Sequence, residues 1–180
     1  MKISVYNFDF DKAIKKINEK KVKKVAIQIP EGLKIHIFKI IDFFKKNTDA
    51  EFIICGDPCY GACDLLDQKY KDLKIDLIIH IGHTIIPSLK KTKIPIIFIN
   101  ANADLNIREV LEKAIPSLNG KKIGITTTAQ HADSIDIARD ILIKNDFEPV
   151  VGKGDKRIEF PGQIIGCNFS LSIFINKLIT

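Results

Sequence analysis

Val25-Ala26-Ile27-Gln28-Ile29 is an apolar run of strand length, and the chain that follows it decides the fold. An amphipathic segment covers residues 33–46, and a second apolar run, Glu51-Phe52-Ile53-Ile54, comes after it. The apolar residues of the amphipathic segment have a spacing that forms one stripe on a helix: Leu33, Ile37, Ile40, Ile41 and Phe44. Nearly continuous apolar strands joined by such a helix predict a parallel sheet that is covered on both faces.

The same alternation continues towards the C-terminus. We expect strands at residues 76–80, 94–99 and 122–126, helices at 107–115 and 134–144, and extended chain at 149–152. Pro116-Ser117-Leu118-Asn119-Gly120 interrupts the pattern before it restarts, which predicts a domain boundary. The predicted architecture is α/β, with a Rossmann-like domain containing a parallel sheet over residues 1–117. A similar domain over residues 118–180 has too few elements to cover its apolar faces, so we expect it to be incomplete.

Composition and missing motifs narrow the class of protein. The chain has 180 residues, 46% of them hydrophobic, and a net charge of +6, much of it in short lysine runs. Such runs indicate solvated ends of helices and strands. The sequence has no basic stripe interleaved with aromatic residues, so direct nucleic-acid binding is not expected. The apolar runs have strand length and no signal peptide is evident, so we expect a cytoplasmic protein without a membrane span. The common nucleotide-binding and hydrolase motifs are absent from the sequence.

A cysteine-rich loop, Gly56-Asp57-Pro58-Cys59-Tyr60-Gly61-Ala62-Cys63-Asp64, follows the second predicted strand. Loops at this end of a parallel strand form ligand sites in α/β proteins. Cysteines in a chain without a signal peptide favour metal or redox chemistry over disulfides. Cys55, Cys59 and Cys63 recur every four residues, a spacing that resembles loops binding iron-sulfur clusters or zinc. Cys55 closes an apolar strand and is expected to be buried, whereas the spacing leaves the role of Cys59 open.

Further candidate residues follow the other predicted strands. They lie in Gln28-Ile29-Pro30-Glu31-Gly32, His80-Ile81-Gly82-His83, Thr126-Thr127-Thr128-Ala129-Gln130-His131 and Gly162-Gln163-Ile164-Ile165-Gly166-Cys167-Asn168. The ends of parallel strands gather at one edge of a sheet, so these groups could surround a common cavity. Each also has a structural explanation as a cap, a turn or a hydrogen-bonded histidine. His80, His83 and a cysteine could form a zinc site, although the sequence shows no closed set of four ligands.

Five separated motifs together resemble the archaeal diphthamide synthase family. They are Gln28-Ile29-Pro30-Glu31-Gly32-Leu33, Tyr60-Gly61-Ala62-Cys63-Asp64, His80-Ile81-Gly82-His83, Thr127-Thr128-Ala129-Gln130-His131 and Pro161-Gly162-Gln163-Ile164-Ile165-Gly166-Cys167-Asn168. They occur in the family's order over about residues 23–170, whereas any one alone could arise by chance. The resemblance implies transfer of a 3-amino-3-carboxypropyl group from S-adenosylmethionine to a histidine of translation elongation factor 2. This is the first step of diphthamide formation.

The resemblance also implies a cofactor and a set of site residues. The implied architecture is three similar α/β domains around one 4Fe-4S cluster. Each domain contributes one cysteine ligand, and the fourth iron has an open site for the substrate. By position, Cys63 and Cys167 match the ligands of the first two domains, and Cys59 matches none. The implied mechanism is that an electron from the reduced cluster cleaves the carbon-sulfur bond of S-adenosylmethionine, which leaves methylthioadenosine. The aminocarboxypropyl radical would then attack the imidazole carbon. Four residues are expected to line the cavity and bind the cofactor, with no catalytic role assigned to any of them: Glu31, His83, Gln130 and His131.

The third cysteine and its domain have no counterpart in this sequence, and the resemblance stops after Phe169. The expected assembly is therefore a homo-oligomer, as is common in the family, or a complex with a chain that supplies the third cysteine. Alternatives are a truncated product, a non-catalytic partner subunit of the synthase, or a different three-domain cluster enzyme with the architecture of quinolinate synthase. The local motifs match that last enzyme poorly.

Overall fold

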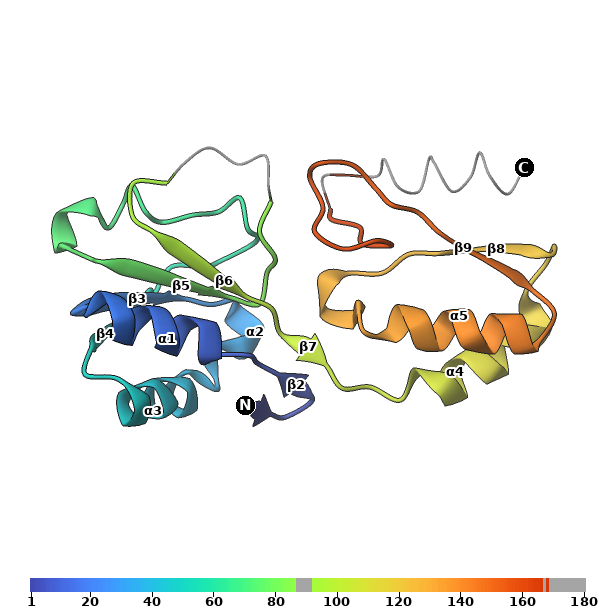
Figure 1. The fold of residues 1–180 in the computed structure, drawn as a ribbon, viewed down its shortest axis with the longest axis horizontal. Coiled ribbons are helices and arrows are strands. Elements are labelled where there is room, and N and C mark those ends of the chain that lie inside the picture. The colour runs from blue at the N-terminus through green and yellow to red at the C-terminus, as the bar shows by residue number, and fades with distance from the viewer. Residues whose placement is uncertain (87–91, 167, 169–180) are drawn as a thin grey trace. The chain divides into compact units, whose positions relative to one another are not determined.

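The computed structural model describes residues 1–86, 92–166 and 168. The chain divides into two compact units: the first contains Met1–Ile85 and ends at Ala101, and the second begins at Asn102 (Figure 1). The predicted boundary after residue 117 therefore falls later than the division between the two units. The reason is that the helix over residues 107–114 packs against the next helix in the second unit rather than on the first sheet.

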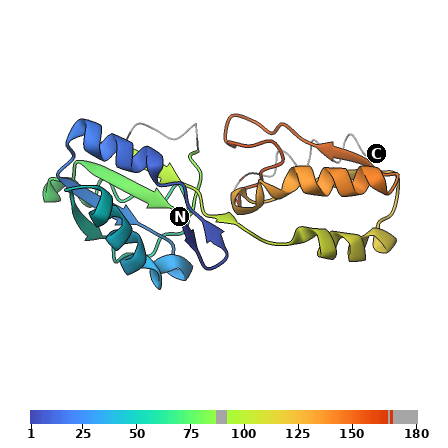
Figure 2. The same ribbon diagram turned by 60° about the horizontal axis from the view of Figure 1, so that its bottom comes forward.

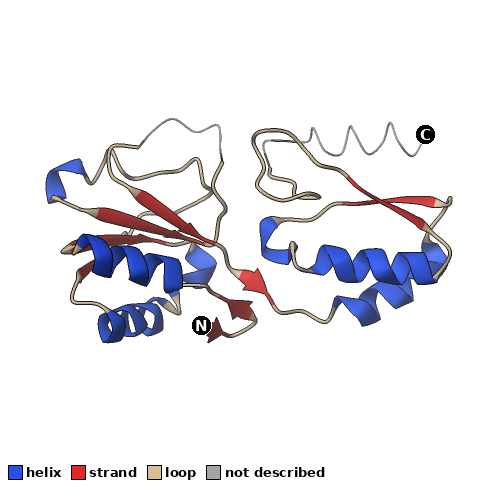
Figure 3. Ribbon diagram, in the orientation of Figure 1, coloured by secondary structure: helices blue, strands red, loops and turns tan. Residues whose placement is uncertain are grey.

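The first unit is built on a parallel sheet of four strands. They are β3 (Lys24–Gln28), β4 (Glu51–Ile54), β5 (Leu77–Ile81) and β6 (Ile96–Ile99), in the spatial order β4-β3-β5-β6 (Figure 3). All five residues of β5 are buried, which is the environment that its continuous apolar sequence requires. The predicted α/β class and parallel sheet are confirmed.

One face of this sheet carries the larger core. Helices α1 (Asp11–Lys20) and α3 (Ile37–Asn47) pack there against alternate residues of β3 and β5. Phe44 of α3 is fully buried, and its ring centroid lies 4.8 Å from that of Phe10 and 5.4 Å from that of Phe52. The predicted single helix over residues 33–46 is two helices, since the short α2 (Glu31–Lys34) ends before α3 begins. The hairpin strands β1 (Lys2–Ile3) and β2 (Tyr6–Asn7) precede α1.

The other face is covered by irregular chain instead of a long helix. The segment between β4 and β5 contains only the short 3-10 helix η1 (Lys71–Leu73), and its Leu66 and Tyr70 pack against a second core cluster. That cluster comprises Ala26, Cys55, Ile75, Ile78 and Ile94. The cysteine-rich loop is thus the first part of a segment that lies on this face, next to the carboxyl ends of β3 and β5.

The second unit contains two parallel strands, β8 (Lys122–Ile125) and β9 (Glu148–Val151), within the described part of the chain. Its other elements are β7 (Asn102–Ala103), α4 (Ile107–Ala114), η2 (Ile115–Ser117), η3 (Ala129–His131) and α5 (Ser134–Lys144). Helices α4 and α5 lie side by side (Figure 2). No helix of the described chain is long and apolar enough to cross a membrane.

Candidate functional site

The strand order of the first unit creates a place for a ligand between two neighbouring strands. The chain moves from β3 outwards to β4 and then returns to the other side of β3 as β5, so the connections leave in opposite directions. Such a switch point opens a crevice at the carboxyl ends of the strands. Gln28 and His80 occupy this point, because they are register partners at the ends of β3 and β5.

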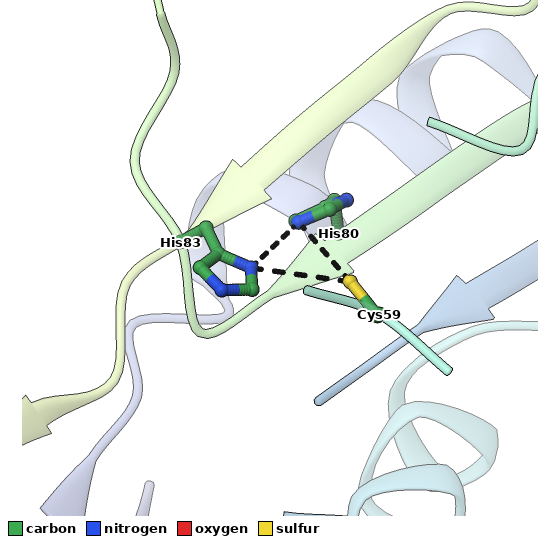
Figure 4. A group of neighbouring side chains, drawn as sticks. All are labelled: Cys59, His80 and His83. Carbon is green, nitrogen blue, oxygen red and sulfur yellow. Dashed lines mark hydrogen bonds between the residues drawn. The ribbon is translucent and has the colours of Figure 1, made fainter. Parts of the chain in front are cut away.

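Three potential metal ligands converge at the switch point (Figure 4). His80 Nε2 lies 2.9 Å from His83 Nδ1 and 3.7 Å from Cys59 Sγ, and Cys59 Sγ lies 4.0 Å from His83 Nδ1. Cys59 and His80 are buried, and His83 is partly exposed. We call Cys59, His80 and His83 the Cys-His cluster.

Gln28 fixes the orientation of the buried imidazole in the Cys-His cluster. Its amide nitrogen donates a hydrogen bond to the main-chain carbonyl of Asp64, so its Oε1 faces His80 Nδ1 at 3.2 Å. Because an amide oxygen only accepts, His80 carries its proton on Nδ1 and presents a lone pair at Nε2. The lone pair therefore points at His83 Nδ1 and Cys59 Sγ.

Burial keeps the cluster side chains in their neutral forms. It lowers the pKa of His80 to about 3, with a further lowering from the neighbouring His83, and it also lowers the pKa of His83. Burial raises the pKa of the Cys59 thiol, whereas hydrogen bonding from the Gly61 amide and the Gln28 side chain lowers it. Burial outweighs these hydrogen bonds, so the pKa of Cys59 is raised and the thiol stays protonated in the metal-free chain.

The neutral His80 makes stability depend on pH. Its pKa is lower in the folded chain than in the unfolded one, so between about pH 3 and 6.5 the unfolded chain binds more protons. Stability is therefore fully present above pH 6.5 and is lost as pH falls through this window. We expect metal-free protein to lose about 2 kcal/mol from this group between pH 7 and 5. Urea unfolding in a chelator measures it, and an equal loss in His80→Gln would exclude His80 as the cause.

The cysteine-rich loop is anchored by side chains on both of its sides. The Lys34 ammonium donates to the carbonyls of Gly56 and Asp57 at 2.9 and 3.1 Å. The Tyr70 hydroxyl donates to the Asp57 carboxylate at 2.8 Å, and Lys69 pairs with the same carboxylate. Hydrogen bonds from Lys69 and Tyr70 hold the pKa of Asp57 below its usual range. The loop is therefore tied to α2 and to the segment before η1.

Cys63 is the exposed thiol of this anchored loop. Cys55 and Cys59 are buried, and burial raises the pKa of Cys55 to about 11, as expected for an inert core thiol. Gly61 leaves room beside Cys63, because a Cβ at Gly61 would lie 3.6 Å from the Cys63 sulfur. An exposed thiol with small neighbours in a fixed loop fits a ligand to a bulky iron-sulfur cluster. The prediction that Cys55 is buried is confirmed.

The other predicted cavity residues lie in different surroundings. Glu31 is exposed and pairs with Lys34, so in the described structure it supports the loop anchor. His83 belongs to the Cys-His cluster. Gln130 and His131 lie in η3 of the second unit. His131 lines a hollow of about 590 Å³ in that unit, together with apolar residues of α4 and α5. We call this the second-unit hollow.

Cys167 lies outside the described residues, but the chain on both sides of it is placed. Gly162 and Gln163 extend the second sheet, because Thr127 N–H donates to Gly162 O at 2.9 Å and Ile164 N–H to Thr127 O at 2.8 Å. The buried Gln163 accepts from the main-chain N–H groups of Glu159 and Phe160. This segment, which follows β9 in the chain, therefore lies beside the residues just beyond the carboxyl end of β8. The cysteine-rich loop likewise lies beyond the carboxyl end of a strand, β4.

Gly162 has a backbone conformation that disfavours any side chain. Its φ is +77°, and an added Cβ would lie 2.7 Å from Ile135 Cδ1 and 3.1 Å from Val151 Cγ1. We expect Gly162→Ala to destabilise the second unit by about 1–3 kcal/mol. Gly166→Ala is the matched control, because nothing lies within 4 Å of its added Cβ. Hydrogen exchange at the amides of Thr127 and Ile164 measures the effect, and equal protection in both variants would contradict it.

Sequence reasoning raised a zinc site of His80, His83 and a cysteine, but it did not single out Cys59 or the contact between Gln28 and His80. Gln28 and His80 are 52 residues apart, and only the pairing of β3 with β5 makes them neighbours. The available signal was a polar residue at the end of each of two apolar strands. Cys59, which spacing left open, belongs to this group.

The fold and the site together define a class: an α/β protein that presents thiols and imidazoles at the switch point of a parallel sheet, as metal- and cofactor-binding proteins do. Residues 29–174 match the family described as "Putative diphthamide synthesis protein". The chain belongs to this family.

Named relatives agree with the family match. The 2-(3-amino-3-carboxypropyl)histidine synthase of Pyrococcus horikoshii is 36% identical over 88% of this chain and 46% of its own length. Subunit 1 of the synthase from Caenorhabditis elegans is 30% identical over 91% of this chain and 42% of its own. The crystal structure of Dph2 from Pyrococcus horikoshii with a 4Fe-4S cluster has a TM-score of 0.84 and 34% identity, covering 92% of this chain and 49% of that chain. The chain thus spans about half the length of these relatives.

Proposed function

We propose that this chain supplies Cys63 and Cys167 as thiolate ligands of a 4Fe-4S cluster in a 2-(3-amino-3-carboxypropyl)histidine synthase. The reaction transfers the 3-amino-3-carboxypropyl group of S-adenosylmethionine to a histidine of translation elongation factor 2. The observation that carries the proposal is Cys63, an exposed thiol on an anchored loop beside the switch point, in a chain similar to a Dph2 structure that holds such a cluster.

The residues of this chain would position the reactants. When bound, the cluster supplies the electron that cleaves the carbon-sulfur bond of S-adenosylmethionine by radical chemistry. Lys34 and Tyr70 hold the start of the loop that carries Cys63, through Gly56 and Asp57. Glu31, His83, Gln130 and His131 stay proposed cofactor-binding residues, with no individual role assigned to any of them. The second-unit hollow, which His131 lines, has a volume in the usual range for small-molecule sites.

We propose that this chain contributes two of the thiolate ligands of the cluster. The proposed assembly is a homo-oligomer or a complex with a chain that supplies the third cysteine, and it works in the cytoplasm on elongation factor 2. Anaerobic reconstitution of the chain with iron and sulfide, alone and with candidate partners, tests this. The broad visible absorbance of a 4Fe-4S centre should appear or increase with the correct partner. A chain that takes up no iron in any combination would refute the proposal.

A non-catalytic partner subunit is the second candidate function. The match covers 46% of the length of the Pyrococcus synthase, so the match alone does not carry the activity of the whole synthase to this chain. Under this candidate, the double variant Cys63→Ala/Cys167→Ala would still support full transfer activity in the complex. Under the proposed function, the same variant would be inactive.

A further inference from the structure

We propose that the Cys-His cluster, formed by Cys59, His80 and His83, is a separate site for one divalent transition metal ion of the zinc type. The site uses none of the cysteines assigned to the 4Fe-4S cluster, and His83 is the one residue that it shares with the proposed function. One thiolate and two imidazoles form a donor set that suits zinc and leaves a fourth position open.

The distances between the ligand atoms fit a shared ion. Zn–S and Zn–N bonds of about 2.3 and 2.05 Å in tetrahedral geometry require S···N separations of about 3.5 Å and an N···N separation of about 3.3 Å. The observed S···N separations are 3.7 and 4.0 Å, and the N···N separation is 2.9 Å. Shifts of about 0.5 Å or less would therefore place all three atoms around one ion.

The groups behind the ligands have the orientation that a metal site needs. Gln28 Oε1 accepts the Nδ1 proton of His80, which leaves Nε2 as the coordinating atom, and the Asp64 carbonyl holds Gln28 in place. Such an outer partner is typical of metal-bound histidine. Hydrogen bonding from Gly61 and the Gln28 side chain offsets part of the effect of burial, which raises the pKa of the Cys59 thiol.

Metal binding has a defined proton balance. In the metal-free chain, the proton between the two imidazoles belongs to His83 Nδ1, because the nitrogen of His80 that faces it is unprotonated. To coordinate through Nδ1, His83 moves this proton to its Nε2, and Cys59 loses its thiol proton to solvent. Binding of one ion therefore releases one proton.

Cobalt(II) titration of the full, metal-free chain under anaerobic conditions tests the site. We expect one equivalent to give thiolate-to-cobalt charge-transfer absorption, which zinc then removes, with release of one proton per ion. The spectrum should be unchanged in Cys63→Ala/Cys167→Ala and in the matched control Cys55→Ala. It should be absent in Cys59→Ala, and Gln28→Leu should weaken binding by about 10- to 100-fold.

The titration overturns the proposal if the wild-type chain gives no charge-transfer band or if the band survives Cys59→Ala, above all if it is then lost in Cys63→Ala/Cys167→Ala. That last result would place the ion at the cysteines assigned to the cluster. X-ray absorption at the cobalt edge of the wild-type chain gives an answer even if a variant fails to fold. One sulfur and two imidazole nitrogens are expected around the ion, and two or more sulfurs would refute the site.

Discussion

Replacing Cys63 by alanine is expected to remove cluster assembly and lower aminocarboxypropyl transfer by about 100-fold or more. Loss of an outer partner of a metal ligand already costs about 10- to 100-fold, and loss of the ligand itself should cost more. Cys63 is exposed, so the change removes little packing. Iron content after anaerobic reconstitution and transfer from labelled S-adenosylmethionine to elongation factor 2, both measured in the complete assembly, provide the readouts.

Cys55→Ala is the matched control for this experiment. It removes a thiol from the same region, but Cys55 is buried in the second core cluster and its raised pKa disfavours the thiolate. We expect iron content and activity to stay near those of the wild type, with a modest loss of stability. Full iron content in Cys63→Ala would show that the assigned ligand is wrong.

The largest expected loss of stability follows from Phe44→Ala. Phe44 is fully buried, and its ring contacts Phe10 and Phe52, so the change removes core area and leaves a cavity. The expected cost is about 3–5 kcal/mol in the free energy of unfolding of the first unit. Guanidinium unfolding, followed by far-ultraviolet circular dichroism, measures this cost.

Phe38→Ala on the same helix is the control, because Phe38 is 72% exposed. It removes the same side chain from the same element but should change stability by less than about 0.5 kcal/mol. Similar losses in the two variants would mean that α3 packs on the sheet through a different face.

The strands and most helices could be predicted because each depends on a local pattern. The apolar runs became β3 to β6, and the strand and helix expected at residues 122–126 and 134–144 became β8 and α5. The break between α2 and α3 was missed, since the apolar stripe continues across it. The division between the units was placed too late because the packing of α4 on α5 is a tertiary contact that no local pattern records.

The candidate site was predictable only in part. The assignment of Cys63 and Cys167 as ligands stays a prediction from the family motifs, and in the structure the Cys63 thiol is exposed. Glu31 was expected to line a cavity, yet in the described structure it pairs with Lys34. The Cys-His cluster depends on strand order, because Gln28 and His80 meet only where β3 and β5 pair.

Anomalous scattering at the iron edge, from crystals of the reconstituted chain with the partner that completes its ligands, tests the central claim most directly. The account predicts iron density bonded to the sulfurs of Cys63 and Cys167, with the Cys-His cluster free of the four-iron centre. Iron-sulfur density bonded to Cys59 instead, with Cys63 unligated, would contradict it.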